Sequence, residues 1–398
     1  MEHDPRISYF ATTNFRNANT RFGIKQADRL SHIHILGKTG TGKSTLMETL
    51  IAQDIASGRG CALIDPHGDL AERIVARMPA WRQQDLTYVD LTNPNQRYGY
   101  NPLTHVSPER RSLVASGVME LFEKMWPQAW GQRMEHILRN TLLALLDYPE
   151  ATLADILRLY TDKTYRSGVI ANITNEQVRT FWRKEYPKYT FRYEAEAVAP
   201  IQNKVGAFLA DPRLYRFLVT PEQPIRIRRI MDESKILVVN LAKGRIGADS
   251  SSLLGGLLVT AISLAAFSRA DVPESNRRPF HVYIDEFQTF TTLSIANMTA
   301  ELRKYAIGLV LVHQYFHQLA PDVRHAVVGN SGTMISFRVG AEDAEYLARE
   351  FQPVFGTEDL VRLPNHRIYL RLMIDGEPSK PFSATTIATS CAFAKTTP

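Results

Sequence analysis

The sequence predicts an α/β protein in which an inserted all-alpha domain interrupts a mostly parallel sheet. Continuous apolar runs alternate with amphipathic segments near both ends of the chain, which is typical of parallel strands covered by helices on both faces. From about Ser107 to residue 225 the apolar residues instead recur at i, i+3 and i+4, the spacing of helices. We therefore expect one domain from 1–105 and 226–398, and an inserted domain from 106–225.

The first part of the sheet is predicted to contain strands at 32–36, 61–65 and 86–91, with helices that begin near Lys43 and Asp69. The inserted domain should begin at Ser107, because a serine followed by proline is a helix-start signal. Its amphipathic stretches are 107–125, 131–148 and 152–161.

The strands are expected to return after the insertion. The chain should then close with a hairpin that turns at an Asp-Gly pair, and its last residues, 388–398, should be frayed. The predicted strands are 224–230, 235–242, 281–287, 307–314 and 332–339, and the hairpin is 367–387.

Composition is that of a globular protein with a modest positive charge. The chain has 398 residues, 44% of them hydrophobic, and a net charge of +6, which suits a polyanionic partner without requiring one. Its two cysteines, Cys61 and Cys391, are not expected to form a disulfide, and no Cys/His cluster has the spacing of a structural zinc site.

The uncharged stretch 250–268 is almost long enough to cross a bilayer. It contains several Ser, Thr and Gly residues and lies between two predicted buried strands, so a crossover helix between parallel strands explains it more simply. The first twenty residues lack the apolar segment of a signal peptide, and we expect a cytoplasmic protein.

The stretch Gly37-x-x-x-x-Gly42-Lys43-Ser44 fits the P-loop pattern between a predicted strand and a predicted helix. Its glycines let successive N–H groups point at phosphate oxygens, while Lys43 reaches the terminal phosphates and Ser44 can bind Mg²⁺. We therefore expect ATP and Mg²⁺ as cofactors. The predicted nucleotide-binding residues are Gly37, Lys38, Thr39, Gly40, Thr41, Gly42, Lys43, Ser44 and Thr45.

Two carboxylates at the end of the predicted strand 281–287 can complete such a site. Asp285 is the candidate metal ligand beside Ser44, and Glu286 is the candidate group that orients and polarises the attacking water. A GTPase is disfavoured: residues 65–68 fit a D-x-x-G switch motif, but no N-K-x-D guanine-reading motif is present.

Two further residues complete the predicted catalytic set of Lys43, Glu286, Gln314 and Arg303. Gln314 ends the next predicted strand, so it should lie beside the terminal phosphate and could report its loss to moving parts of the protein. Arg303 is predicted at a helix end on the periphery of its own site, where it could reach a neighbouring subunit's phosphate. A solvated helix end is the alternative for Arg303.

These residues together resemble the HerA/FtsK group of hexameric DNA-pumping ATPases, and most closely the conjugative type IV coupling proteins with a TraD-like or TraM-recognition ATPase domain. The resemblance covers about 23–387 and implies a RecA-like P-loop NTPase that binds ATP between the subunits of a hexamer and moves DNA. It also implies that Gln314 is the family's third-motif glutamine and Arg303 its trans-acting arginine. The resembling stretches are 35–47, 62–75, 88–93, 101–102, 201–214, 284–290, 302–314 and 337–351.

Coupling proteins usually begin with transmembrane helices, and this sequence does not. The resemblance therefore implies that either the membrane anchor is a separate subunit or the motor is soluble. With a separate anchor, the cytoplasmic protein would be peripheral at the inner membrane through its partners. Relaxosome or secretion-channel proteins are the other candidate partners, and the family's all-alpha domain is thought to meet the DNA or its protein escort.

Four functions stay open at this point. The leading one is a DNA translocase for conjugative transfer; the others are a HerA-like motor in repair or phage defence, a protein-moving secretion ATPase, and a nucleotide-gated scaffold. The intact set of Lys43, Asp285 and Glu286 argues against the scaffold. The aromatic and basic stretch 181–193 could stack on bases and follow phosphates, but a packed helical subdomain is the favoured interpretation.

Overall fold

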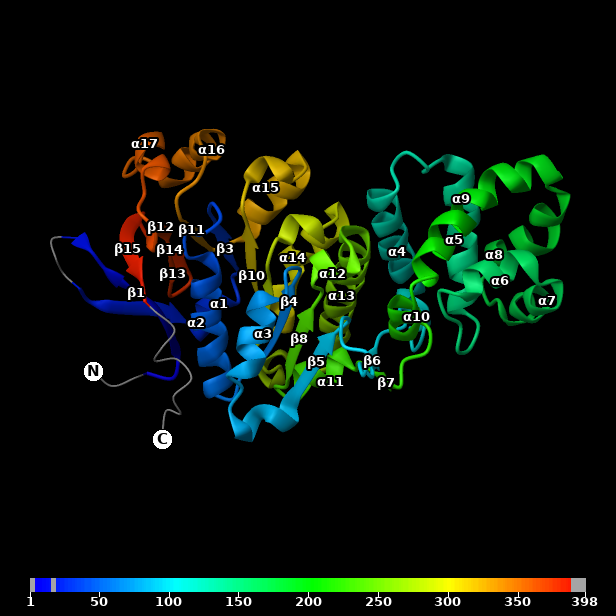
Figure 1. Cartoon of the computed structure of the whole chain (residues 1–398), viewed down its shortest axis with the longest axis horizontal. Helices are drawn as coiled ribbons and strands as arrows, with labels where there is room; N and C mark the ends of the chain where they lie inside the picture. Colours follow the sequence, from blue (N-terminus) through cyan, green and yellow to red (C-terminus); the bar gives the residue numbers. More distant parts are fainter. Residues whose placement is uncertain (1–3, 16–18, 388–398) are drawn as a thin grey trace. The chain divides into compact units, whose positions relative to one another are not determined.

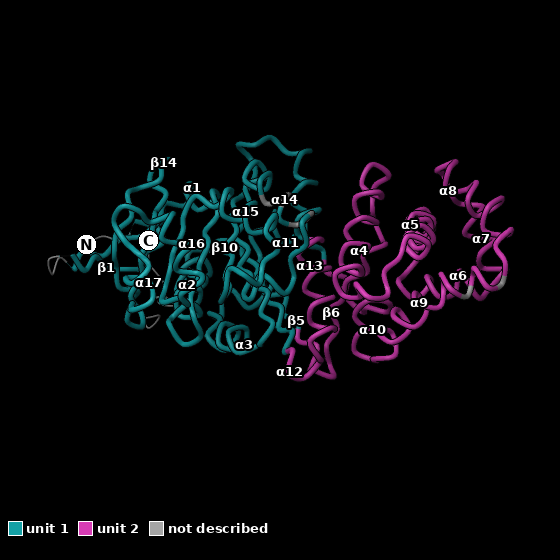
Figure 2. The backbone as a smooth tube through the Cα atoms, turned by 90° about the horizontal axis from the view of Figure 1, so that it is seen from above, with its two compact units in different colours: residues 1–89, 226–242, 262–398 teal, residues 90–225, 243–261 magenta. Residues whose placement is uncertain are grey.

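The computed structural model describes residues 4–15 and 19–387, so Cys391 and the tail 388–398 lie outside the described residues. The chain divides into two units, shown in teal and magenta in Figure 2. Unit 1 contains residues 1–89, 226–242 and 262–398, and unit 2 contains 90–225 and 243–261. The second unit thus begins before residue 106 and includes the start of a later helix. That the insertion 106–225 is a domain of its own stays a prediction.

The described residues of unit 1 form one eleven-stranded sheet. Its central strands pair in parallel and four strands at one side pair antiparallel, which confirms the predicted α/β fold with a mostly parallel sheet. The strand order is β2 (Arg21–Lys25), β1 (Ile7–Thr13), β15 (Phe382–Thr386), β12 (Arg367–Arg371), β11 (Thr333–Ser336), β3 (Ile33–Leu36), β10 (Ile307–His313), β9 (Phe280–Ile284), β4 (Gly60–Asp65), β8 (Ile236–Asn240) and β5 (Leu86–Asp90).

The antiparallel side of the sheet was only partly predicted. The closing hairpin is confirmed: β12 pairs with β15, the short strands β13 (Met373–Ile374) and β14 (Glu377–Pro378) extend it, and Asp375 and Gly376 turn it with φ of 53° and 84°. Strands β1 and β2, which add to the outer edge of β15, were not predicted. These two strands extend the sheet beyond the predicted set.

The prediction of a strand at 224–230 is wrong, because most of this stretch forms helix α11 (Ile227–Asp232). The alternation of isoleucine and arginine resembles a half-buried strand. The buried residues Ile227, Ile230 and Met231 are instead spaced i, i+3 and i+4, as one face of a helix requires. Only a two-residue strand, β7 (Gln223–Pro224), precedes it and pairs with β6 (Tyr98–Gly99).

Helices cover both faces of the sheet (Figure 1). The predicted helices α2 (Lys43–Ala56) and α3 (Asp69–Ala76) form one core with alternate residues of the strands, and α16 (Ala341–Phe351) forms a second core on the opposite face. Besides α11, the described part of unit 1 also contains α1 (Gln26–Arg29), α14 (Leu293–Leu302), α15 (Pro321–Asn330) and α17 (Thr357–Val361).

Unit 2 is mainly helical, and three aromatic residues of the stretch 181–193 are packed inside it. Phe181, Trp182 and Tyr186 are buried, with Trp182 Nε1 donating to the carbonyl of Asn140 (3.2 Å) and the Tyr186 hydroxyl donating to Glu194 (2.6 Å). This supports the favoured interpretation of 181–193 as a packed subdomain. The helices are α4 (Arg111–Met125), α5 (Gln132–Leu146), α6 (Asp155–Thr161), α7 (Lys163–Asn172), α8 (Glu176–Thr180), α9 (Phe191–Leu209), α10 (Pro212–Leu218) and α12 (Lys243–Ile246).

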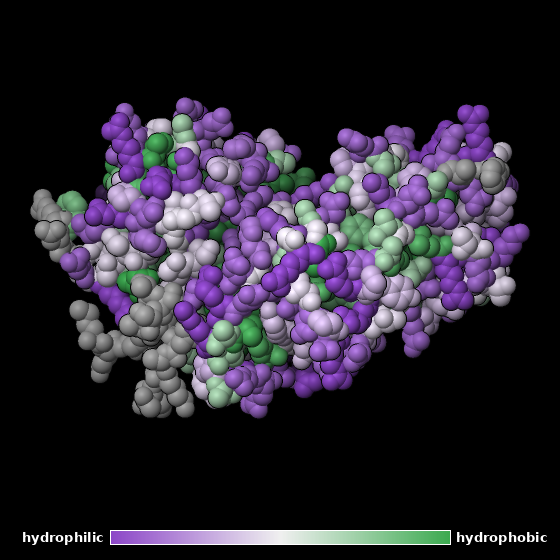
Figure 3. Space-filling view, in the orientation of Figure 1, coloured by the Kyte–Doolittle hydropathy of each residue, from purple (hydrophilic) through white to green (hydrophobic). Residues whose placement is uncertain are grey.

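Helix α13 (Ala248–Ser268) connects the parallel strands β8 and β9, as the crossover interpretation predicted. In the described part of the chain, the stretch Ala248–Asp271 is long and apolar enough to cross a membrane. Its 18-residue window has mean hydropathy 1.7, and 78% of that window is buried within the protein. On the face shown in Figure 3, hydrophobic residues form small, separate patches among hydrophilic ones. The helix is therefore long enough to span a bilayer, but most of its apolar residues are buried inside the protein.

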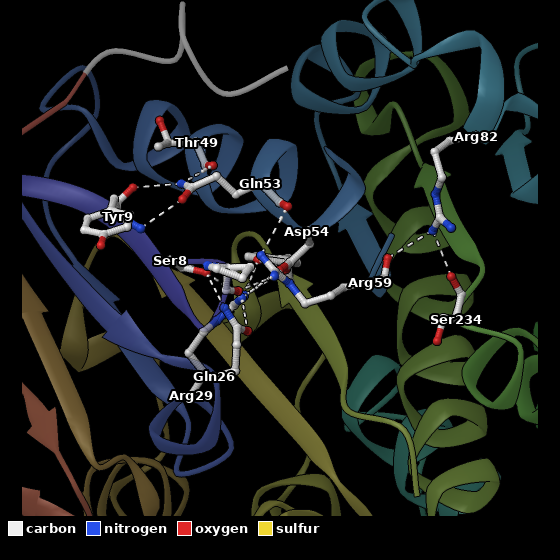
Figure 4. A network of polar contacts seen from close by, with 12 residues as sticks. Ser8, Tyr9, Gln26, Arg29, Thr49, Gln53, Asp54, Arg59, Arg82 and Ser234 are labelled. Carbon is white, nitrogen blue, oxygen red and sulfur yellow. Dashed lines mark hydrogen bonds and ion pairs between the residues drawn. The ribbon is translucent and has the colours of Figure 1, made fainter. Parts of the chain in front are cut away.

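A buried cluster of polar groups joins the first helices of unit 1 to the centre of its sheet (Figure 4). The guanidinium of Arg29 donates to both carboxylate oxygens of Asp54 (2.6 and 2.9 Å), and both side chains are fully buried. The Tyr283 hydroxyl on β9 donates to Asp54 (2.5 Å), and Arg59 donates to the same carboxylate (2.7 Å). Burial has the largest single effect and would raise the pKa of Asp54, but the charge and hydrogen bonds of Arg29, together with other neighbouring groups such as Arg59, outweigh it and hold that pKa well below its usual range.

Replacing Arg29 by methionine should destabilise the protein by about 3–5 kcal/mol, because it leaves the Asp54 carboxylate buried without its main partner. Urea unfolding of the variant measures this. Arg362→Met is the matched control, since Arg362 pairs with Glu358 at an exposed site and should shift the midpoint little. Equal midpoints for the two variants would contradict a structural role for the buried cluster.

Candidate functional site

A cleft in unit 1 lies at the carboxyl edge of the parallel strands, where sheets of this class bind ligands. Strands β3, β4, β9 and β10 all end here. The structure thus brings together predicted residues that are far apart in the sequence. The lining residues are Thr39, Gly40, Gly42, Lys43, Ser44, Thr45, Asp65, His67, Asp69, Leu70, Arg73, Asp285, Glu286, Gln314 and His366.

The predicted P-loop connects β3 to α2, and its conformation depends on glycine. Gly40 and Gly42 have φ of 76° and 120°, outside the range that other residues readily adopt. A Cβ on Gly42 would also lie 2.9 Å from the ring of His366, and one on Gly37 would lie 2.6 Å from Phe337. Gly37, Lys38 and Thr41 shape the loop without lining the cleft, the Thr41 hydroxyl donating to the carbonyl of Lys38 (2.7 Å).

Lys43 is held inside the curl of this loop. Its ammonium donates to the carbonyls of Gly37 (2.6 Å) and Lys38 (3.0 Å), and the residue is 7% exposed. Burial lowers the pKa of Lys43, whereas the nearby carboxylates of Asp285 and Glu286 act in the opposite direction. The first residue of α2 therefore places a desolvated cation between the loop and the acidic side of the cleft.

Asp285 directly follows β9 and is 8% exposed. Burial, with the neighbouring charges of Asp65 and Glu286, raises the pKa of Asp285 to about 7, although Lys43 opposes the shift. Such crowding of carboxylates favours a bound cation, since a cation relieves the repulsion between them.

Asp285 and Ser44 line the same cleft and fit Mg²⁺, which prefers one or two protein oxygens together with ligand phosphates. In the part of the chain that the structure describes, no group of three His, Cys, Asp or Glu side chains could hold a metal by itself. Phosphate oxygens and water would therefore complete the coordination.

Glu286 is fixed by hydrogen bonds to both of its carboxylate oxygens. The side-chain amides of Gln314 and Gln288 each donate to one oxygen, and the residue is 7% exposed with a left-handed backbone (φ 47°). Gln314 also accepts a hydrogen bond from the hydroxyl of Thr39 (3.0 Å). Gln314 thus connects the P-loop directly to Glu286, an arrangement in which a change at the phosphates could reach both.

Residues 65–68 fit a switch motif, but their place in the cleft was not predicted from the sequence. Asp65 accepts hydrogen bonds from the backbone N–H groups of His67 and Ala71 (both 2.9 Å) and so shapes the turn into α3. The His67 ring lies 3.8 Å from Glu286. An acidic residue at the end of a predicted parallel strand was the signal that could have identified Asp65.

Arg303 lies apart from this cleft in its own chain. It follows α14, is exposed, and has no ion-pair or hydrogen-bond partner for its side chain among the described residues. In a single chain, therefore, Arg303 does not line the cleft.

Comparison with known proteins gives the family. A family model described as the type IV secretion-system coupling protein DNA-binding domain matches residues 21–369. No curated protein sequence matches the chain.

Solved structures show the same fold at low sequence identity. The bacterial conjugative coupling protein TrwBdeltaN70 is 13% identical with a TM-score of 0.67, covering 98% of this chain and 90% of that one. The plasmid coupling protein TrwB in complex with the ATP analogue ADPNP gives 14% and 0.65, covering 100% and 92%. VirB4 of Thermoanaerobacter pseudethanolicus gives 14% and 0.68, covering 98% and 99%. With the family match spanning most of its length, the chain belongs to the type IV secretion-system coupling protein family.

Proposed function

We propose that this protein is an ATP-hydrolysing motor that moves DNA through a ring of its own subunits in type IV secretion or conjugative transfer. The observation that carries the proposal is the convergence of Lys43, Asp285, Glu286 and Gln314 on one cleft at the end of the P-loop strand. A scaffold that binds nucleotide without hydrolysis would not need a carboxylate held like Glu286, with both oxygens hydrogen-bonded.

In this mechanism the P-loop N–H groups bind the phosphates, and Lys43 exchanges its loop carbonyls for the terminal phosphate oxygens. Ser44 and Asp285 would hold Mg²⁺, which neutralises charge on the phosphates when bound. Glu286 orients the attacking water and accepts its proton on a carboxylate oxygen. Gln314, bonded to both Thr39 and Glu286, transmits loss of the terminal phosphate to strand β10.

ATP with Mg²⁺ is the proposed nucleotide. TrwB, with which this chain shares its fold, has been solved with the ATP analogue ADPNP, with ADP and Mg²⁺, and with the GTP analogue GDPNP. The absence of a guanine-reading N-K-x-D motif in the sequence is the reason for choosing ATP.

DNA is the proposed substrate. The proposed motor is cytoplasmic and reaches the inner membrane through its partners. The matching family is described as a DNA-binding domain, and the net charge of +6 is compatible with a polyanion. Relaxosome or secretion-channel proteins and a separate membrane anchor are the proposed partners.

Lys43→Ala should abolish nucleotide binding, whereas Glu286→Gln should keep ATP bound and slow hydrolysis roughly 100-fold or more, because only the second residue acts on the water. ATP binding and phosphate release by each variant test this division. Glu301→Gln, an exposed helix position outside the cleft, is the matched control. Wild-type phosphate release by Glu286→Gln would remove Glu286 from the mechanism.

If Arg303 completes the site of a neighbouring subunit, a mixture of inactive Arg303→Ala and Lys43→Ala subunits should regain activity. Some junctions then combine an intact Lys43 from one subunit with an intact Arg303 from the next. Mixing Lys43→Ala with Glu286→Gln is the control and should stay inactive, since both residues line the cleft of one chain. Co-assembled but inactive Arg303→Ala and Lys43→Ala mixtures would contradict the trans assignment.

DNA should stimulate ATP turnover by the assembled protein, and the stimulation should decline as salt rises, because phosphate contacts release counterions. Little sequence preference is expected, since phosphate contacts carry no base information. Turnover measured against DNA length and salt concentration tests this. ATP turnover that is unchanged by DNA at low salt but rises when a protein substrate is added would favour a protein-moving secretion ATPase instead.

A further inference from the structure

His366 lies on the side of the P-loop away from the catalytic carboxylates. The local strand order is β12, β11, β3, β10, β9, so the P-loop strand β3 has β9 two places to one side and β12 two places to the other. Asp285 follows β9, whereas His366 directly precedes β12, which runs antiparallel to β11 and therefore begins at the same edge of the sheet. His366 and Asp285 thus line opposite sides of one cleft.

The backbone of His366 is hydrogen-bonded both to the P-loop and to strand β15. Its N–H donates to the carbonyl of Thr41 (2.9 Å), and its own carbonyl accepts from the N–H (2.9 Å) and hydroxyl (3.2 Å) of Thr386. These bonds hold a left-handed conformation (φ 62°), which is uncommon for a residue other than glycine. A strained backbone that its surroundings hold in place is a recurrent feature of ligand sites.

The imidazole of His366 touches the loop but keeps its own polar atoms free. Its Nδ1 lies 2.9 Å from where a Cβ on Gly42 would be, so the ring covers the residue just before Lys43. His366 is exposed, and neither ring nitrogen has a hydrogen-bond or ion-pair partner among the described side chains and backbone groups. A flat ring with a free donor and acceptor is therefore presented to the cleft.

The positions of Glu286 and His366 on opposite sides of the P-loop determine the direction in which a bound nucleotide lies. Hydrolysis requires the terminal phosphate beside Glu286, and His67 and the α3 residues of the cleft lie on that same side, at or beyond β9. The opposite end of the nucleotide then leaves the P-loop toward β12. His366 is the residue of the cleft lining that β12 brings to this end.

We propose that His366 contacts the nucleoside part of the bound nucleotide, its ribose or its base, and so adds affinity for a nucleotide over a bare polyphosphate. The proposal rests on nucleotide binding at the P-loop, the function proposed above. The competing explanation is that the ring only packs on Gly42 and supports the loop. The two differ in which ligand should lose affinity when the ring is removed.

The test compares ADP with pyrophosphate, which carries two phosphates and no nucleoside, by calorimetric titration in the presence of Mg²⁺. His366→Asn removes the ring while keeping a residue that tolerates the left-handed backbone. It should weaken ADP binding roughly tenfold, the size expected for loss of one base-stacking contact. Pyrophosphate binding should be unchanged, and His325→Asn, the same change at an exposed position on α15, should affect neither ligand.

A second measurement uses the unaltered protein and does not depend on the variant folding. Diethyl pyrocarbonate modifies accessible histidines, and mass spectrometry locates the modified sites. ADP should protect His366 from modification while pyrophosphate does not, with His325 as the internal reference in each sample.

Equal loss of ADP and pyrophosphate affinity in His366→Asn would overturn the proposal in favour of loop support. Unchanged ADP affinity, or no protection of His366 by ADP, would overturn it as well. A wild-type protein that binds neither ligand would instead contradict nucleotide binding itself, so failure of the inference and failure of the proposed function give different results.

Discussion

The buried ion pair between Arg29 and Asp54, with the Tyr283 hydroxyl bound to both, is the interaction on which the rest of the site depends. Asp54 belongs to the helix that begins at Lys43, and Tyr283 lies two residues before Asp285 on β9. The cluster therefore fixes the helix of the P-loop against the strand that supplies the carboxylates. Removing one partner of such a buried pair is strongly destabilising. The pair therefore helps to hold α2 and β9 at the spacing that the cleft requires.

The charges in the cleft follow from that fixed spacing. Lys43 is desolvated and faces Asp285 and Glu286, while burial and neighbouring carboxylates raise the pKa of Asp285. The Lys43 ammonium and the two carboxylates are thus in position before a ligand binds. The phosphates of a metal-bound triphosphate would pair with the ammonium, and the metal would pair with the carboxylates. The hydrogen bonds from Gln314 to Glu286 and from Thr39 to Gln314 join this charged centre to strand β10. If the protein is the motor proposed above, this connection would carry the nucleotide state to strand β10.

The central fold was predictable because its strands are continuous apolar runs followed by residues with evident chemistry. The P-loop and Asp285 could be located in this way, since each follows such a run. Strands β1 and β2 were missed because they form the antiparallel outer edge, where pairing with β15 rather than a local pattern defines them. His366 could not be found from sequence, because only the strand order brings it to Gly42.

Displacement of a protein roadblock from DNA tests most directly whether energy from this cleft moves DNA. The assembled protein should remove a tightly bound protein from a DNA fragment when ATP is present. The Glu286→Gln variant should bind ATP and DNA but leave the roadblock in place. Equal displacement by the variant, or displacement without ATP, would contradict the account, because movement would then not depend on hydrolysis at this site.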